Sequence, residues 1–345
     1  MEELTRVDPS EDPYLALRTA LAVAICLLVA EPLGITIPML PVVMAMSMTS
    51  GQRGALTARP FAGPLILPII AIIFSWLAAV TVNMPFVFTA VNALLMIGGL
   101  ALMLFRGSRG GMMLTVFPLL MAMMALYSDY ALAAMRDSMV LGGLALGVAT
   151  IVLNILFPPQ TSRVHVEVVA PLVTDRPVAA LMIRLAVYLP IMLLTFASGD
   201  MNLLIVPIML LFVCAEPSHG RRMNQVVDRG GGTLIGGFIS AAVLCLYSLV
   251  PQPAVLILLC TAVTYFLIDK MTTGVGRPLR YQYICSTVLV MVLSATSGGS
   301  DALEVVLKRV VLTSGAMIGS ILLLALLETI FLGEQDGGRS APVLA

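Results

Sequence analysis

The chain has 345 residues, of which 59% are hydrophobic and only 11% are charged, and its 19 basic and 19 acidic side chains give a formal net charge of zero. This composition excludes both a soluble globular domain and a disordered chain. The sequence therefore predicts an integral membrane protein. The zero net charge does not specify a partner; we expect contact with membrane lipids and no nucleic-acid partner.

Apolar segments long enough to cross a bilayer recur along the whole chain. A helix needs about 20 mainly apolar residues to cross ~30 Å of hydrocarbon, and the alternating strands typical of a transmembrane barrel are absent from the sequence. Twelve helices are predicted, of which those at 35–50, 112–128 and 201–217 are short. The predicted ranges are 14–33, 35–50, 60–82, 84–105, 112–128, 130–157, 178–198, 201–217, 230–250, 253–269, 281–297 and 303–332.

Basic residues occupy every second connection between these helices, and the intervening connections are short and carry no Lys or Arg. By the positive-inside rule the basic connections are cytoplasmic, so both termini are predicted to lie in the cytoplasm. Residues 1–13 are acidic and polar, and we expect no cleavable signal peptide. The basic connections carry Arg53, Arg59, Arg106, Arg109, Arg163, Arg176, Arg221, Arg222, Arg229, Lys270, Arg277 and Arg280.

Matched residues recur in the same order in the two halves of the chain. The separation is 166 positions for Arg18 and Arg184 and grows to 173 for Arg136 and Arg309. A small drift of one sign is expected from loop insertions after an old duplication. We therefore predict an all-α membrane protein of two parallel, pseudo-symmetric six-helix repeats. The predicted parts are a first repeat at 1–157, a cytoplasmic linker at 158–177, a second repeat at 178–332, and a cytoplasmic tail at 333–345. The alternating residues 164–169 of the linker could form a short strand.

Four arginines lie inside predicted membrane helices, as the pairs Arg18/Arg184 and Arg136/Arg309. A cation within a bilayer is costly and usually faces a protein interior or a water-filled path. The first pair is predicted near the cytoplasmic ends of its helices and the second near the periplasmic ends, so the four could line the two mouths of an anion path. The alternative is that these long side chains snorkel to the headgroups.

Prolines give a second matched signal. Pro38 and Pro41 fall in the second predicted helix, and Pro207 falls at the corresponding place in the eighth. Proline removes a backbone donor and interrupts a helix, and interrupted helices at matching positions are typical of transporter binding sites. We place Pro41 and Pro207 on the substrate path; simple packing kinks are the alternative.

A glycine-rich motif opens the ninth predicted helix directly after a basic connection. Arg229, Gly232, Thr233 and Gly236 spell Arg-x-x-Gly-Thr-x-x-Gly, which resembles the signature of the fusaric acid resistance protein-like superfamily. That group includes bacterial aromatic acid exporters and aluminium-activated malate transporters of plants. The first half departs from the motif, and the extensive cytoplasmic domains of larger exporters have no counterpart here.

This resemblance implies export of small organic anions, often aromatic carboxylic acids, across a bacterial inner membrane by a multi-pass protein. It also implies a periplasmic adaptor protein of the membrane-fusion type as a partner. From the residues alone, a passive anion channel driven by the membrane potential and a non-transporting membrane scaffold remain the alternatives.

Proton coupling would require carboxylates, and the candidates are Asp129, Asp137 and Glu304. Asp137 beside Arg136, and Glu304 one turn before Lys308, are equally explained as local ion pairs. We expect no enzyme activity and no catalytic residues, because clustered acids, His ligands or a Ser/His arrangement are absent from the predicted membrane helices. No cofactor and no metal site are expected.

Overall fold

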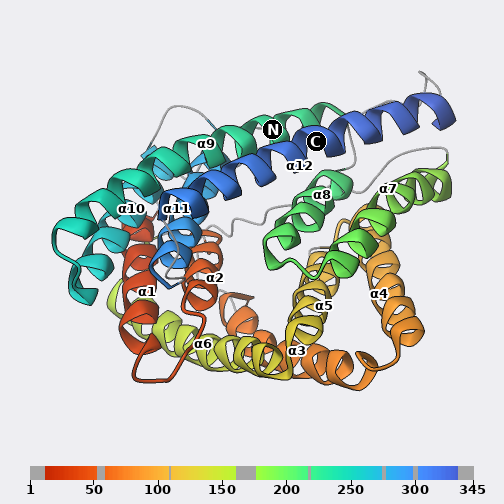
Figure 1. The fold of residues 1–345 in the computed structure, drawn as a ribbon. Helices are drawn as coiled ribbons and strands as arrows, with labels where there is room; N and C mark the ends of the chain where they lie inside the picture. Colours follow the sequence, from red (N-terminus) through yellow and green to blue (C-terminus); the bar gives the residue numbers. More distant parts are fainter. Residues whose placement is uncertain are drawn as a thin grey trace. The chain divides into compact units, whose positions relative to one another are not determined.

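The computed structural model describes residues 12–52, 59–108, 110–160, 176–216, 219–273, 277–297 and 302–332. Twelve α-helices and one 3₁₀ helix lie in these ranges (Figure 1). The helices are α1 (Leu15–Ala30), α2 (Met39–Ser50), α3 (Arg59–Thr81), α4 (Pro85–Arg106), α5 (Gly110–Tyr127), α6 (Asp129–Leu156), α7 (Pro177–Ser198), η2 (Met201–Leu204), α8 (Ile205–Ala215), α9 (His219–Leu249), α10 (Pro253–Thr273), α11 (Pro278–Ser297) and α12 (Ala302–Leu332).

The all-helical prediction is confirmed for the described part of the chain. Eight of these helices, α3 to α7, α9, α10 and α12, are long and apolar enough to cross a membrane, while α1, α2 and the η2–α8 segment are shorter apolar helices. The segment 164–169, which could form a short strand, lies outside the described residues. Large apolar side chains also point outward, with Phe86 90% and Phe238 80% exposed. Such side chains suit a lipid-facing surface.

Local sequence sets the helix ends. The helices α4, α7, α10 and α11 each begin with a proline, whose fixed φ and missing N–H suit the first helical position. Gly107 after α4 and Gly199 after α7 both adopt positive φ, a conformation that glycine tolerates better than other residues and that commonly ends helices. Asp200 then accepts a hydrogen bond from the backbone N–H of Asn202 and caps η2.

One predicted boundary is wrong. The ninth helix begins at His219 rather than near residue 230, so Arg221, Arg222 and Arg229 are helical instead of forming a loop. Arginine, methionine and glutamine favour helix, and the segment contains no proline. A hydropathy criterion misses it because that criterion registers apolar content and not helix propensity.

The chain divides into two compact units that each draw on both sequence halves. Unit 1 comprises Met1–Ile73, Ala133–Glu167 and Gly231–Val310, and unit 2 comprises Phe74–Leu132, Val168–Gly230 and Val311–Ala345. In unit 1, α1 packs on α2 and α10, and α11 packs on α10 and α2 (Figure 1). In unit 2, α7 packs on α8 and α4, and α5 packs on α4 and η2.

Three contacts of unit 2 repeat contacts of unit 1 with each helix replaced by the one six places away: α7 packs on α8 as α1 packs on α2, α4 on α7 as α10 on α1, and α4 on α5 as α10 on α11. This recurrence supports the duplication, which itself stays a prediction. The core of unit 1 includes Cys26, Met46, Ile268 and Leu289. The core of unit 2 includes Leu100, Leu119, Tyr188, Leu210 and Leu324, and every side chain in both sets is fully buried or nearly so.

Candidate functional site

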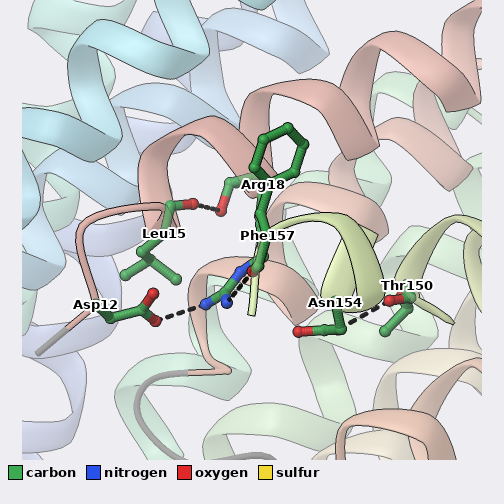
Figure 2. A network of polar contacts seen from close by, with 7 residues as sticks. Asp12, Leu15, Arg18, Thr150, Asn154 and Phe157 are labelled. Carbon is green, nitrogen blue, oxygen red and sulfur yellow. Dashed lines mark hydrogen bonds and ion pairs between the residues drawn. The ribbon is translucent and has the colours of Figure 1, made fainter. Parts of the chain in front are cut away.

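Arg18 lies near the start of α1 in unit 1, and its side chain is almost completely buried, with 5% exposed. Its Nη2 lies 2.5 Å from the Asp12 Oδ2, and its Nη1 donates a hydrogen bond of 2.9 Å to the carbonyl oxygen of Phe157 (Figure 2). The Asp12 side chain is fully buried. The guanidinium is thus neutralised by one carboxylate, and it ties the start of α1 to the end of α6, where helix carbonyls lack intrahelical partners.

Arg184, the matched residue, lies near the start of α7 in unit 2, and its side chain is 1% exposed. Its Nη2 donates to the carbonyl oxygen of Glu216 over 3.1 Å and lies 3.9 Å from the Glu328 Oε1. The other oxygen of the same carboxylate, Oε2, lies 2.5 Å from Nη2 of Arg222 on α9. Arg184, Arg222 and Glu328 together are called the Arg184 cluster, in which two buried guanidiniums share one bridging carboxylate.

The two matched arginines therefore occupy comparable places with different partners. Each contacts a residue near the end of the sixth helix of its own half: Phe157, directly after α6, for Arg18, and Glu328, four residues before the end of α12, for Arg184. Both are buried as expected for cations in an apolar protein. Whether a substrate passes them stays a prediction.

Arg136, Arg309 and the predicted proton carriers lie in simpler surroundings. Arg136 pairs with the adjacent Asp137 at 2.8 Å, and both side chains are about half exposed, at 42% and 56%. Glu304 pairs with Lys308 one turn later, and both are exposed. Asp129 is the exposed first residue of α6, and Arg309 is partly buried in α12. For Asp137 and Glu304 the structure thus contains the local ion pairs considered above.

The prolines do not interrupt helices. Pro41 and Pro207 are each the third residue of a helix, α2 and α8, and a missing N–H is harmless in a first turn because that donor has no intrahelical partner. The expected interruptions at Pro38 and Pro41 and at Pro207 are therefore wrong, although the matched placement holds. Pro41 is buried against α6, where a Cβ on Gly142 would lie 2.5 Å from its Cβ.

The glycine motif serves close helix packing in unit 1. A Cβ on Gly232 would lie 3.2 Å from the Cβ of Tyr283, and one on Gly236 would lie 2.8 Å from the Cγ2 of Thr287. Thr233 is buried. Small residues allow two helix backbones to approach closely, so these glycines bring α9 against α11. In unit 2, the Arg229 guanidinium lies 3.5 Å from the ring centre of Phe212, in cation–π contact.

Replacing Gly236 with alanine is expected to destabilise the protein by about 1–3 kcal/mol, because the added methyl group overpacks the contact with α11. The matched control is Gly230→Ala on the same helix, where an added Cβ meets nothing within 4 Å. That control should be neutral or stabilising by up to about 0.8 kcal/mol through helix propensity. Thermal unfolding of the detergent-purified protein measures both, and equal melting temperatures would contradict the packing role.

In the described ranges, the fold is that of an all-helical, multi-pass membrane protein. Residues 185–325, from α7 to α12, match the fusaric acid resistance protein-like family, which confirms the family resemblance inferred from the motif. Arg222 and the motif from Arg229 to Gly236 lie inside this match, and Arg184 and Glu328 lie just outside it. No curated protein and no solved structure gives a significant match. The family suggests a function in membrane transport or resistance.

Sequence reasoning assigned Arg222 to topology and missed its place in the Arg184 cluster. A helical reading of 219–229 would have found it, because Arg222, Val226, Arg229 and Thr233 recur at intervals of three or four residues on one face. All four side chains are buried or partly buried. Glu328 has no comparable signal, because its partners lie far away in sequence.

Proposed function

We propose that this protein is an inner-membrane transporter that exports small organic anions, with aromatic carboxylic acids as the substrate class. The observation that carries the proposal is the second buried guanidinium beside Arg184: Arg222 is only 3% exposed and shares a carboxylate with it. Arginine binds carboxylates through a planar, bidentate fork and stays charged in a low-dielectric site. The family match over residues 185–325 supports a transport function.

The contacts within each unit support the proposed topology with both termini in the cytoplasm. Arg18 joins the start of α1 to the end of α6, and the Arg184 cluster joins the starts of α7 and α9 to the end of α12. The topology assigns all these helix ends to the cytoplasmic side. We include the bacterial inner membrane and a periplasmic adaptor protein of the membrane-fusion type in the proposal.

Transport by inside-out membrane vesicles tests the proposal. Vesicles containing the protein should take up radiolabelled benzoate faster than vesicles without it, because cytoplasmic export corresponds to uptake in this orientation. A pH gradient and a potassium–valinomycin potential are imposed separately. Stimulation by the pH gradient alone identifies a proton-coupled pump, and uptake that follows the potential alone identifies a passive channel. Uptake equal to that of empty vesicles for benzoate and other aromatic acids would contradict export and leave a scaffold.

A further inference from the structure

Glu328 lies between two cationic side chains that are more deeply buried than it is. The side chains of Arg184 and Arg222 are 1% and 4% exposed, and that of Glu328 is 19% exposed. One carboxylate oxygen contacts Arg222 closely at 2.5 Å, whereas the other is 3.9 Å from Arg184, beyond hydrogen-bond length. The Glu328 carboxylate therefore lies between the two guanidiniums, is more exposed than either, and makes only a long contact with Arg184.

Two further buried donors belong to the same unit, one on Tyr188 and one on Arg222. The Tyr188 hydroxyl is on the same face of α7 as Arg184, one turn later, and the Tyr188 side chain is 0% exposed. This hydroxyl and Nε of Arg222 have no hydrogen-bond partner among the described residues. A buried donor without a partner is costly, and a bound anion would satisfy donors of this kind.

The matched place in unit 1 lacks this surplus of donors. Residues of the two halves are matched by the offsets of the nearest arginine pairs. The offset of Arg59 and Arg229 matches Arg222 with Gln52. The offset of Arg136 and Arg309 matches Glu328 with Ile155. Arg18 instead has its own fully buried carboxylate, Asp12, at 2.5 Å. One half thus holds a closed ion pair, and the other holds two guanidiniums around a partly exposed carboxylate.

We propose that Arg184, Arg222 and Tyr188 form a carboxylate-binding site, and that Glu328 is a tethered internal ligand which a substrate carboxylate displaces. This proposal rests on the proposed export of organic anions. The incoming carboxylate takes over the donors of both guanidiniums and adds the Tyr188 hydroxyl, while Glu328 moves to its exposed side. The other ionisable groups facing the cluster are Glu216 and Cys214 at the end of α8. Neither contributes a third positive charge, and Glu216 is a second carboxylate near Arg184.

Equilibrium binding of radiolabelled benzoate to the full-length, detergent-purified protein tests the site, with uncharged benzamide as competitor control. Glu328→Gln should bind benzoate about tenfold more tightly, because the substitution removes an internal carboxylate that competes for the two guanidiniums. Arg222→Gln should bind about tenfold more weakly, and Arg222→Lys should recover only part of the loss. Glu31→Gln, which removes an exposed carboxylate after α1, should bind like the wild type.

Unchanged or weaker benzoate binding by folded Glu328→Gln would overturn the tethered-ligand role. If Glu328→Gln does not fold, the Arg222→Gln variant tests the site instead, because it leaves one guanidinium with one carboxylate, as in unit 1. Wild-type benzoate affinity in Arg222→Gln would overturn the proposed site. Vesicle flux separates this proposal from the transport function. If vesicles transport benzoate but both variants bind it like the wild type, the binding site is contradicted and the transport function is not. If vesicles do not transport benzoate but Glu328→Gln binds it more tightly, the transport function is contradicted and the binding site is not.

Discussion

Replacing Arg184 with glutamine is expected to weaken the apparent substrate affinity by about ten- to a hundredfold. The change removes a charge-assisted contact worth roughly 1.5–3 kcal/mol, while Arg222 remains to compensate the Glu328 carboxylate at 2.5 Å. The concentration dependence of aromatic-acid uptake by inside-out vesicles measures the effect as a rise in KM.

The comparison variants separate binding from membrane anchoring. Arg184→Lys should recover only part of the affinity, because an ammonium lacks the planar fork. Arg106→Gln, which removes an exposed arginine at the end of α4, should leave KM unchanged. Full activity in Arg184→Lys, or a normal KM in Arg184→Gln, would show that Arg184 has only a structural role.

Replacing Arg18 with glutamine is expected to act on stability rather than on affinity. The substitution leaves the fully buried Asp12 carboxylate without its guanidinium, and breaking a buried ion pair by removing one partner typically costs about 3–5 kcal/mol. The apparent melting temperature of the purified protein should therefore fall strongly.

The double variant Asp12→Asn with Arg18→Gln is the control for this interpretation. It removes both charges together and should recover much of the lost stability, because no uncompensated charge then remains buried. Additive losses of stability in the double variant would contradict the ion-pair account. An affinity loss in Arg18→Gln equal to that in Arg184→Gln would show that both matched arginines bind substrate.

Helix positions could be predicted from the sequence because apolar length and proline starts act locally. The fourth, tenth and seventh helices were placed within a few residues of Pro85, Pro253 and Pro177, where they begin. The basic start of α9 was missed because the helices were predicted from apolar length, whereas residues 219–229 favour helix without being apolar. Pro41 and Pro207 were placed correctly but misread, because a proline in a first turn and one in a helix interior look alike until the start of the helix is known.

The partners of the buried charges could not be predicted in the same way. Asp12 is six residues from Arg18 and could have been proposed, whereas Glu328 is 106 residues from Arg222. The role of the motif glycines could not be predicted either, because a glycine-rich helix start permits close approach of a ligand or of a neighbouring helix. The close packing of Gly232 and Gly236 against α11 shows that they serve a neighbouring helix.

The interleaving of the two sequence halves constrains how this protein is made. Helices α1 and α2 are inserted early in synthesis, but their packing partners α10 and α11 emerge only after most of the chain has been translated. The first unit therefore cannot complete its core during insertion of the first half, and the second unit requires α12. A chain terminated after residue 157 would contain α1 and α2 without α10 and α11, and α4 and α5 without α7 and α8. Biogenesis thus depends on complete translation, and two separately expressed halves would have to exchange helices to form either unit.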